Sequence, residues 1–330
     1  MMRLTKVELK RLFSRRLTLI ALLGALGFTG LILFGGYQEA KPLSGQQLAF
    51  QRAQFNETHQ HWEINGVQQM EDCLKRQEID QKNDPKIDYR CNDMEPKWEN
   101  WGKPETKFAD LMPSALLNWS YLIAFISFLI GAGFVAAEFS SGSMGNWLTF
   151  EPRRMRVYAS KLVAAGLGLV PAIVALLGLL FGGVWLITAK YGSTIETTAT
   201  VWSDLGFMAG RSAVLAVVAA IVGAAMGTLL RHTAAVIGIA MGYLIFVELI
   251  FSRMFESARP WLLQINMEGW LKHGTTYYEP CAAVSQGGDM FSCDQAEKFL
   301  EFGHSSAYLG LLVVLVIGLS ALIFQRRDVN

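Results

Sequence analysis

The sequence predicts an all-α integral membrane protein with six transmembrane helices, and three observations lead to this class. Hydrophobic residues occupy 52% of the 330 positions, and Asp, Glu, Lys and Arg together occupy only 17%. A soluble domain carries about 25% charged residues, so this chain is poor in charge. The apolar residues gather in long runs, and the charges are sorted between the connections on either side. An ordinary soluble domain is therefore excluded.

Six runs are long enough to cross a bilayer as helices. A crossing helix needs about 20 mostly apolar residues, and a helix satisfies its own backbone polar groups in hydrocarbon. The first run could instead be a cleaved signal peptide, but its length and the lack of an A-x-A site after Gly36 favour a retained anchor. The fifth run is short and contains Glu248. The predicted spans are residues 17–36, 115–137, 162–189, 205–230, 234–251 and 307–324.

The orientation follows from the distribution of Lys and Arg, which concentrate on the cytoplasmic side of membrane proteins. The connections on the side of the two termini sum to +9, and those on the other side sum to −8. Arg211 and Glu248 lie within spans and cancel, which leaves the net charge of +1. Both termini are therefore expected in the cytoplasm. The near-neutral total gives no indication of a nucleic-acid partner, and none is expected.

Residues 37–114 are predicted to form a small helical extracellular cap, because residues 45–63 and 66–84 both show apolar positions at three-to-four spacing. All four cysteines fall in outer loops, and an even number on the oxidising side indicates disulfides. Three connectivities are open: local pairing, which is favoured, or either of two cross-loop pairings. Free thiols and a zinc site are weaker alternatives. The cysteines are Cys73, Cys91, Cys281 and Cys293.

Catalytic motifs are missing from the sequence. It has no G-x-x-x-x-G-K-[ST], H-E-x-x-H, G-x-S-x-G or G-x-G-x-x-G pattern. His59 and His61 are two residues apart on a predicted helix and diverge, so no metal ligand is expected there. Arg211 and Glu248 are predicted to reach similar depths near the outer end of the fourth and fifth spans. We expect an intramembrane ion pair, with separate snorkelling of the two side chains as the alternative.

The cytoplasmic connection at residues 138–161 carries the most specific pattern. It has an acid where the second span ends, Glu138, then Ser141-Gly142-Ser143, Trp147-Leu148-Thr149, Pro152, Arg153-Arg154 and Lys161. This segment resembles the signature loop of ABC type-2 permeases, the membrane subunits of ATP-driven exporters. Residues 7–19, read as an amphipathic helix leading into the first span, and the closing sequence FQRRDVN at residues 324–330 resemble the same family.

The resemblance implies a mechanism and partners. Two permease subunits, identical or homologous, would form a pathway, and two ABC ATPase subunits would dock below and bind ATP and Mg²⁺, so no cofactor is expected in this chain. Movement would pass through residues 138–161, and residues 260–271 would form a re-entrant roof. Glycine-rich patches at 178–183 and 223–227 permit close helix packing, and either could mediate the dimer. The expected coupling residues are Glu138, Trp147, Glu151, Pro152, Arg153 and Arg154.

The expected function is export of an amphipathic substrate, such as a drug, an antibiotic peptide or a lipid-like molecule, across a prokaryotic cytoplasmic membrane. The long outer loops depart from small family members. The alternatives are a non-transporting assembly or receptor-like protein that acts through the extracellular loop, and an intramembrane enzyme. The chain divides into residues 1–36 (amphipathic helix and first span), 37–114 (extracellular loop), 115–251 (spans two to five), 252–306 (second extracellular loop) and 307–330 (last span and tail).

Overall fold

The computed structural model describes residues 2–82, 88–278 and 297–326. Within these residues six helices are long and apolar enough to cross a membrane, which confirms the predicted number. Each contains one of the predicted apolar runs and extends beyond it. The six are α2 (Arg16–Ala40), α5 (Phe108–Ser140), α7 (Arg154–Tyr191), α8 (Ala199–Leu230), the segment Thr233–Phe251, and α12 (Phe302–Arg326).

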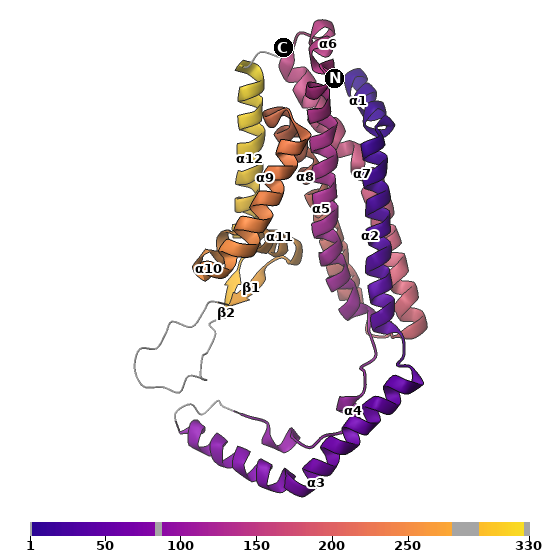
Figure 1. The fold of residues 1–330 in the computed structure, drawn as a ribbon, viewed down its shortest axis with the longest axis vertical. Helices are drawn as coiled ribbons and strands as arrows, with labels where there is room; N and C mark the ends of the chain where they lie inside the picture. The colour runs from indigo at the N-terminus through magenta and orange to yellow at the C-terminus, as the bar shows by residue number, and fades with distance from the viewer. Residues whose placement is uncertain (1, 83–87, 279–296, 327–330) are drawn as a thin grey trace.

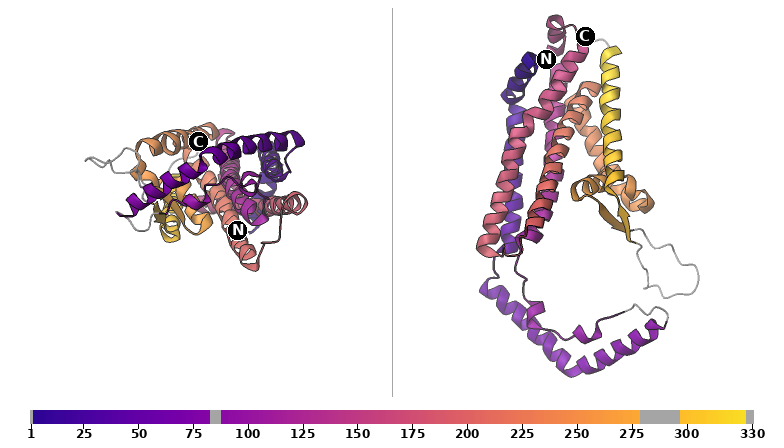
Figure 2. Two further views of the ribbon diagram at one scale, coloured as in Figure 1. Left: turned by 90° about the horizontal axis from the view of Figure 1, so that it is seen from below. Right: turned by 180° about the vertical axis from the view of Figure 1, so that it is seen from behind.

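The molecule is elongated and has two different ends (Figure 1). One end, called here the terminal end, holds the start of α1 (Met2–Ser14), the short helix α6 (Ser143–Phe150) and the end of α12. The opposite end, called the far end, holds the long helix α3 (Gly45–Gln81). The right-hand view in Figure 2 shows the same separation from behind. The two sets of connections that differ in charge therefore lie at opposite ends of the bundle.

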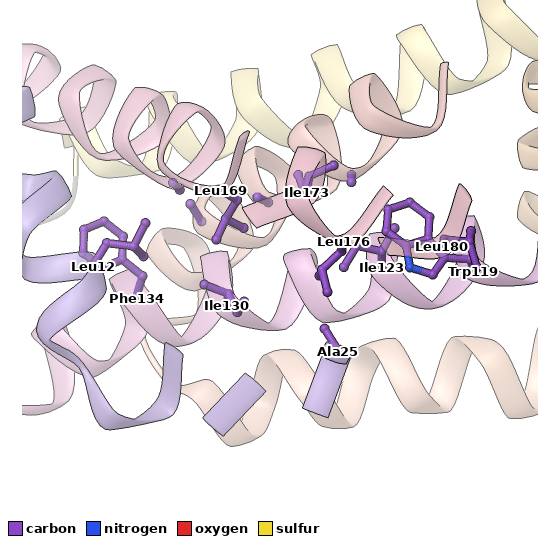
Figure 3. Packing of buried hydrophobic residues seen from close by; sticks show 14 of the residues in the cluster. Leu12, Ala25, Trp119, Ile123, Ile130, Phe134, Leu169, Ile173, Leu176 and Leu180 are labelled. Atoms are coloured by element: carbon purple, nitrogen blue, oxygen red, sulfur yellow. The ribbon is translucent and has the colours of Figure 1, made fainter. Parts of the chain in front are cut away.

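The hydrophobic core lies where α1, α2, α5, α7 and α8 meet (Figure 3). Two polar contacts cross this core. The indole N–H of Trp119 donates to the Thr29 hydroxyl at 3.1 Å, and the hydroxyls of Ser120 and Ser212 lie 2.6 Å apart. The polar groups of these four side chains thus have partners, as an apolar interior favours. By contrast, α2, α9 (Thr233–Gly242) and α12 bury few residues, as expected for helices that face lipid.

Helices α5 and α8 approach each other most closely, and glycines make the approach possible. A Cβ atom added at Gly223 would lie 2.0 Å from the Phe128 carbonyl oxygen, and one added at Gly131 would lie 2.0 Å from the Ala220 carbonyl oxygen. The patch at 223–227 is therefore used for packing within the chain. At Gly178 and Gly182, in the other predicted patch, nothing lies within 4 Å of an added Cβ.

The fifth span changes helix type along its length. It begins as α9 and continues as η2 (Tyr243–Phe251), a nine-residue π-helix that contains Glu248. Most π-helical segments are single turns and are frequent at functional sites. The sequence analysis did not anticipate this change. Within this π-helix, Glu248 lies next to the segment that follows the span.

The segment at the far end is one long helix where two helical stretches were expected. Helix α3 runs through Gly66, against which the ring of Trp62 packs. Its start has a capping box formed by Ser44 and Gln47. Cys73 and Cys91 are joined by a disulfide with a Cα–Cα distance of 5.8 Å, which is the local pairing. Cys281 and Cys293 lie outside the described residues.

The second outer loop contains helices and a small hairpin. After α10 (Ser252–Met254) come the 3-10 helix η3 (Glu256–Trp261) and α11 (Leu263–Lys272), so residues 260–271 are largely helical. The strands β1 (Thr275–Tyr278) and β2 (Glu297–Leu300) then pair antiparallel, with Thr275 opposite Leu300. The sequence analysis missed these strands because each is only four residues long. Two further short elements, η1 (Cys91–Asp93) and α4 (Trp98–Trp101), lie beside α3.

Candidate functional site

The site begins with the short helix α6, which stands at the terminal end between α5 and α7 (Figure 1). The chain leaves α5 at Ser140 and reverses through Gly142, whose φ of +70° is a backbone conformation that favours glycine. The hydroxyl of Ser143 then donates to the carbonyl oxygen of Glu138 at 3.3 Å. Pro152, after the end of α6, prevents the helix from running on into α7. These local features attach α6 to the last turn of α5.

A cluster of buried charges lies where α6 is attached to the last turn of α5, and this place is called here the root of α6. The ammonium group of Lys161 (α7) is 3.0 Å from a carboxylate oxygen of Glu8 (α1) and also contacts the carboxylate of Glu138 (α5). Arg15 donates to the other oxygen of Glu138 at 2.9 Å. Glu8, Glu138 and Lys161 are exposed by only 0%, 2% and 2%. The cluster therefore joins three elements that are far apart in the sequence.

The charges in the cluster compensate one another. Two carboxylates face Lys161 and Arg15, and Arg11 lies 3.8 Å from Glu138. Removing one partner from such a buried pair typically costs about 3–5 kcal/mol, because the remaining charge loses its counter-ion. Burial raises the pKa of Glu8, and the neighbouring Lys161 opposes this rise. The second carboxylate oxygen of Glu8 is buried and has no hydrogen-bond partner.

An aromatic ring supports both cations of the cluster. The Phe134 ring centroid lies 5.2 Å from the guanidinium carbon of Arg15 and 5.4 Å from the Lys161 ammonium. Cations placed over a ring at this range gain electrostatic attraction. Phe134 is on α5, one turn before Glu138. A single turn of α5 thus supplies both the carboxylate and the ring.

The last turn of α12 is attached to the same region. The Phe324 ring centroid lies 6.2 Å from that of Phe139 (α5) and 6.0 Å from that of Tyr158 (α7). The Tyr158 hydroxyl donates to the Ile317 carbonyl oxygen at 3.0 Å. Phe324 opens the closing sequence noted above, and the structure shows that it packs against both helices that flank α6.

The structure places the predicted coupling residues in different surroundings. Glu138 is buried in the cluster, whereas Pro152 and Arg153 are exposed between α6 and α7 and Glu151 is half-buried. A guanidinium nitrogen of Arg154 lies 3.5 Å from the Gln325 carbonyl oxygen of α12. The side chain of Trp147 lies outside the described residues. Among the predicted residues whose side chains the structure describes, only Glu138 lies within the buried cluster at the root of α6.

The sequence alone does not single out Glu8, Arg15 or Lys161 as members of the site. Glu8 and Arg15 contribute only to the charge difference between the two sides, and Lys161 contributes to that difference and to the family pattern. One signal was present: Glu8 is one of the few acids on a side of the protein that is otherwise strongly basic. An acid that persists in a basic segment often has a cationic partner, but sequence alone does not say which one.

The expected ion pair between Arg211 and Glu248 is not formed, and this prediction was wrong. The Glu248 carboxylate accepts the backbone N–H of Leu263 at 2.7 Å, at the start of α11, and the Tyr243 hydroxyl at 2.8 Å. A guanidinium nitrogen of Arg211 is 3.4 Å from the Trp270 carbonyl oxygen, near the end of α11. The partial charges at the two helix ends, positive at the N-terminus and negative at the C-terminus, satisfy these side chains separately.

Comparisons with known proteins identify the family of this chain. The ABC-2 family transporter protein family matches residues 8–329, which is nearly the whole chain and includes Glu8, Glu138 and Lys161. A search among curated proteins returns no match. The family match confirms the resemblance seen in residues 138–161, and the six apolar helices agree with it. The chain therefore belongs to the ABC-2 transporter family and is a multi-pass membrane permease of that family, whose members pair with an ABC ATPase subunit.

Proposed function

We propose that this permease moves an amphipathic substrate outward across a prokaryotic cytoplasmic membrane, driven by ATP hydrolysis in a separate subunit. The terminal end faces the cytoplasm, as the charge difference of +9 against −8 favours. ATP and Mg²⁺ bind to the ATPase subunit and not to this chain. A second permease subunit, identical or homologous, completes the pathway. The substrate is a drug, an antibiotic peptide or a lipid-like molecule.

The proposal rests on the way in which α6 is attached to α1, α5 and α7. A short helix that transmits movement from a docked subunit must be held firmly to the spans that it moves. Here the root of α6 is held by the contacts of Glu138 with Lys161 and Arg15, so a push on α6 reaches α1, α5 and α7 together. The exposed residues Pro152 and Arg153 are available on the surface next to α6.

The test uses the permease co-expressed with its ATPase subunit and reconstituted in liposomes. We expect ATP hydrolysis to rise when an amphipathic substrate is added. Arg153→Ala is expected to weaken co-purification of the ATPase subunit, whereas Arg16→Ala, which removes an exposed arginine of the same end at the start of α2, is not. Glu138→Gln is expected to leave the subunits associated and to uncouple hydrolysis from transport. If no ATPase subunit associates with the native chain, the proposal fails.

A receptor-like or assembly role through the extracellular loop is the second candidate, because α3 exposes several apolar side chains, among them Ile64 and Val67. Replacing residues 45–101 by a short flexible linker separates the two functions. Under the transporter proposal, substrate-stimulated ATP hydrolysis persists in this variant. If hydrolysis persists but the cellular phenotype of the gene is lost, the loop has the receptor-like role.

A further inference from the structure

A groove of about 390 Å³ lies between α1 and α7 near the terminal end. Thr5, Lys6 and Leu9 form one wall, and Ala159, Ser160, Val163 and Leu167 form the other. Next to the groove α1 packs closely on α7: a Cβ added at Gly168 would lie 2.6 Å from a methyl carbon of Leu12.

The lining of the groove changes from polar to apolar along its length. Thr5, Lys6 and Ser160 lie at the end nearer the start of both helices, and Leu9, Val163 and Leu167 lie deeper. Val163 and Leu167 belong to the apolar run that begins at residue 162, yet they are 41% and 60% exposed. Apolar walls offer water few hydrogen-bond partners, so an alkyl chain fits this part better than water does.

Basic side chains stand at the polar end. Lys6 lines the groove with its side chain exposed. Arg156 is exposed on α7, one turn before Ser160 and on the same side of the helix. At ~1.5 Å per residue, Arg156 lies about 10 Å before Val163 along the axis. Two cations at the mouth and alkyl side chains below follow the order of a phospholipid with an anionic head.

We propose that this groove binds one anionic phospholipid from the surrounding leaflet. Its phosphate contacts Lys6 and Arg156, and one acyl chain lies along Leu9, Val163 and Leu167. The charge complementarity at the mouth selects an anionic head over a zwitterionic one, with about 1 kcal/mol per cation, or about fivefold in affinity. A second copy of this chain is the other occupant that an apolar groove could accept, and the experiment below distinguishes it.

The two helices that form the groove, α1 and α7, also carry two members of the buried charged cluster. Glu8 precedes Leu9 on α1, Lys161 follows Ser160 on α7, and the two side chains meet at 3.0 Å behind the groove. A lipid that fills the groove therefore holds α1 against α7 at the same level as this ion pair. Binding would stabilise the α1–α7 contact and with it the root of α6.

The experiment measures lipid binding to the purified full-length chain by native mass spectrometry. The probes are dioleoylphosphatidylglycerol, dioleoylphosphatidylcholine and glycerophosphoglycerol, the last being the head group without acyl chains. The native chain is expected to bind one phosphatidylglycerol more tightly than phosphatidylcholine and not to bind glycerophosphoglycerol. Lys6→Gln and Arg156→Gln are each expected to weaken phosphatidylglycerol binding about fivefold. Val163→Trp is expected to abolish the binding of this lipid by filling the groove.

Matched variants provide the controls. Arg16→Gln removes an exposed arginine at the start of α2, outside both walls of the groove, and Val174→Trp adds the same bulk at an exposed position further along α7. Both are expected to keep native affinity. Equal binding of the two lipids, binding of the head group alone, or an equal loss in Arg16→Gln would overturn the proposal. A dimer in the spectra that Val163→Trp disrupts would also overturn it, because a second copy would then be the occupant.

Discussion

Lys161 and Glu138 form a contact between buried side chains that fixes the start of the third span to the end of the second, directly beneath α6. The two residues are 23 positions apart and bracket the connection that carries the family pattern. Glu8 adds α1 to the same contact through Lys161. The pattern thus marks both sides of a structural junction as well as the exposed loop between them.

Lys161→Met is expected to destabilise the protein by about 3–5 kcal/mol, because it leaves Glu8 and Glu138 buried without their shared cation. Thermal unfolding of the purified protein in detergent measures the loss. Lys190→Met is the matched control, since Lys190 is exposed near the other end of the same helix. If the two variants unfold at the same temperature, the buried charges do not stabilise the protein as expected.

The stability of the native protein is expected to depend on the titration of Glu8. Burial raises the pKa of Glu8 above its ordinary value of 4.5, so the folded state holds this proton more tightly than the unfolded state does. The corresponding contribution to stability is full below pH 4.5 and is lost as the pH rises through the folded-state pKa.

Glu8→Gln removes this titration. The stability of the variant relative to the native protein is therefore expected to improve as the pH rises above about 4.5. Unfolding in urea at a series of pH values measures the difference. A difference that stays constant, or that falls as the pH rises, would contradict the raised pKa.

Arg211 and Glu248 are expected to contribute independently to stability. Each side chain is bound to a different end of α11, and Leu263 and Trp270 are about 10 Å apart along the helix. Effects of sites at this distance usually add within about 0.5 kcal/mol. A double-mutant cycle with Arg211→Ala and Glu248→Ala tests this.

The charge swap Arg211→Glu with Glu248→Arg sharpens that test. It would preserve a direct ion pair, but it places each charge at the wrong end of α11. We expect the swapped protein to be less stable than the native one by more than either single change to Ala. Restoration of native stability would show that the two side chains interact directly.

Gly223→Ala is expected to destabilise the contact between α5 and α8, because the added methyl group would meet the Phe128 carbonyl oxygen at 2.0 Å. Overpacking of this kind costs about 1–3 kcal/mol. Gly178→Ala is the control, with no atom within 4 Å of the new methyl group. Thermal unfolding should show a lower midpoint for Gly223→Ala only, and a similar midpoint for both would rule out close packing at Gly223.

Much of the fold could be predicted because the bilayer constrains the chain so strongly. A run such as residues 162–189 has no other stable arrangement in hydrocarbon than a helix, so its position follows from composition. The short strands β1 and β2 and the π-helix η2 carry no comparable signal, since four-residue strands and changes of helix type depend on neighbouring elements. The sequence likewise does not show that α3 continues through Gly66, over which the ring of Trp62 packs.

For the site, composition and motif alone are enough to predict the class of protein, the number of spans and the segment on which the family pattern lies. Which charges meet depends on how the helices pack. Glu8 and Lys161 are 153 positions apart and become partners only because α1 packs on α7. Arg211 and Glu248 were expected to be partners because they lie at similar predicted depths in the membrane. Instead α11 folds back, and each of its two ends binds one of the two side chains. Hydrophobicity is a property of a local run of residues, whereas ion pairing depends on distances of a few ångströms that only the packed helices set.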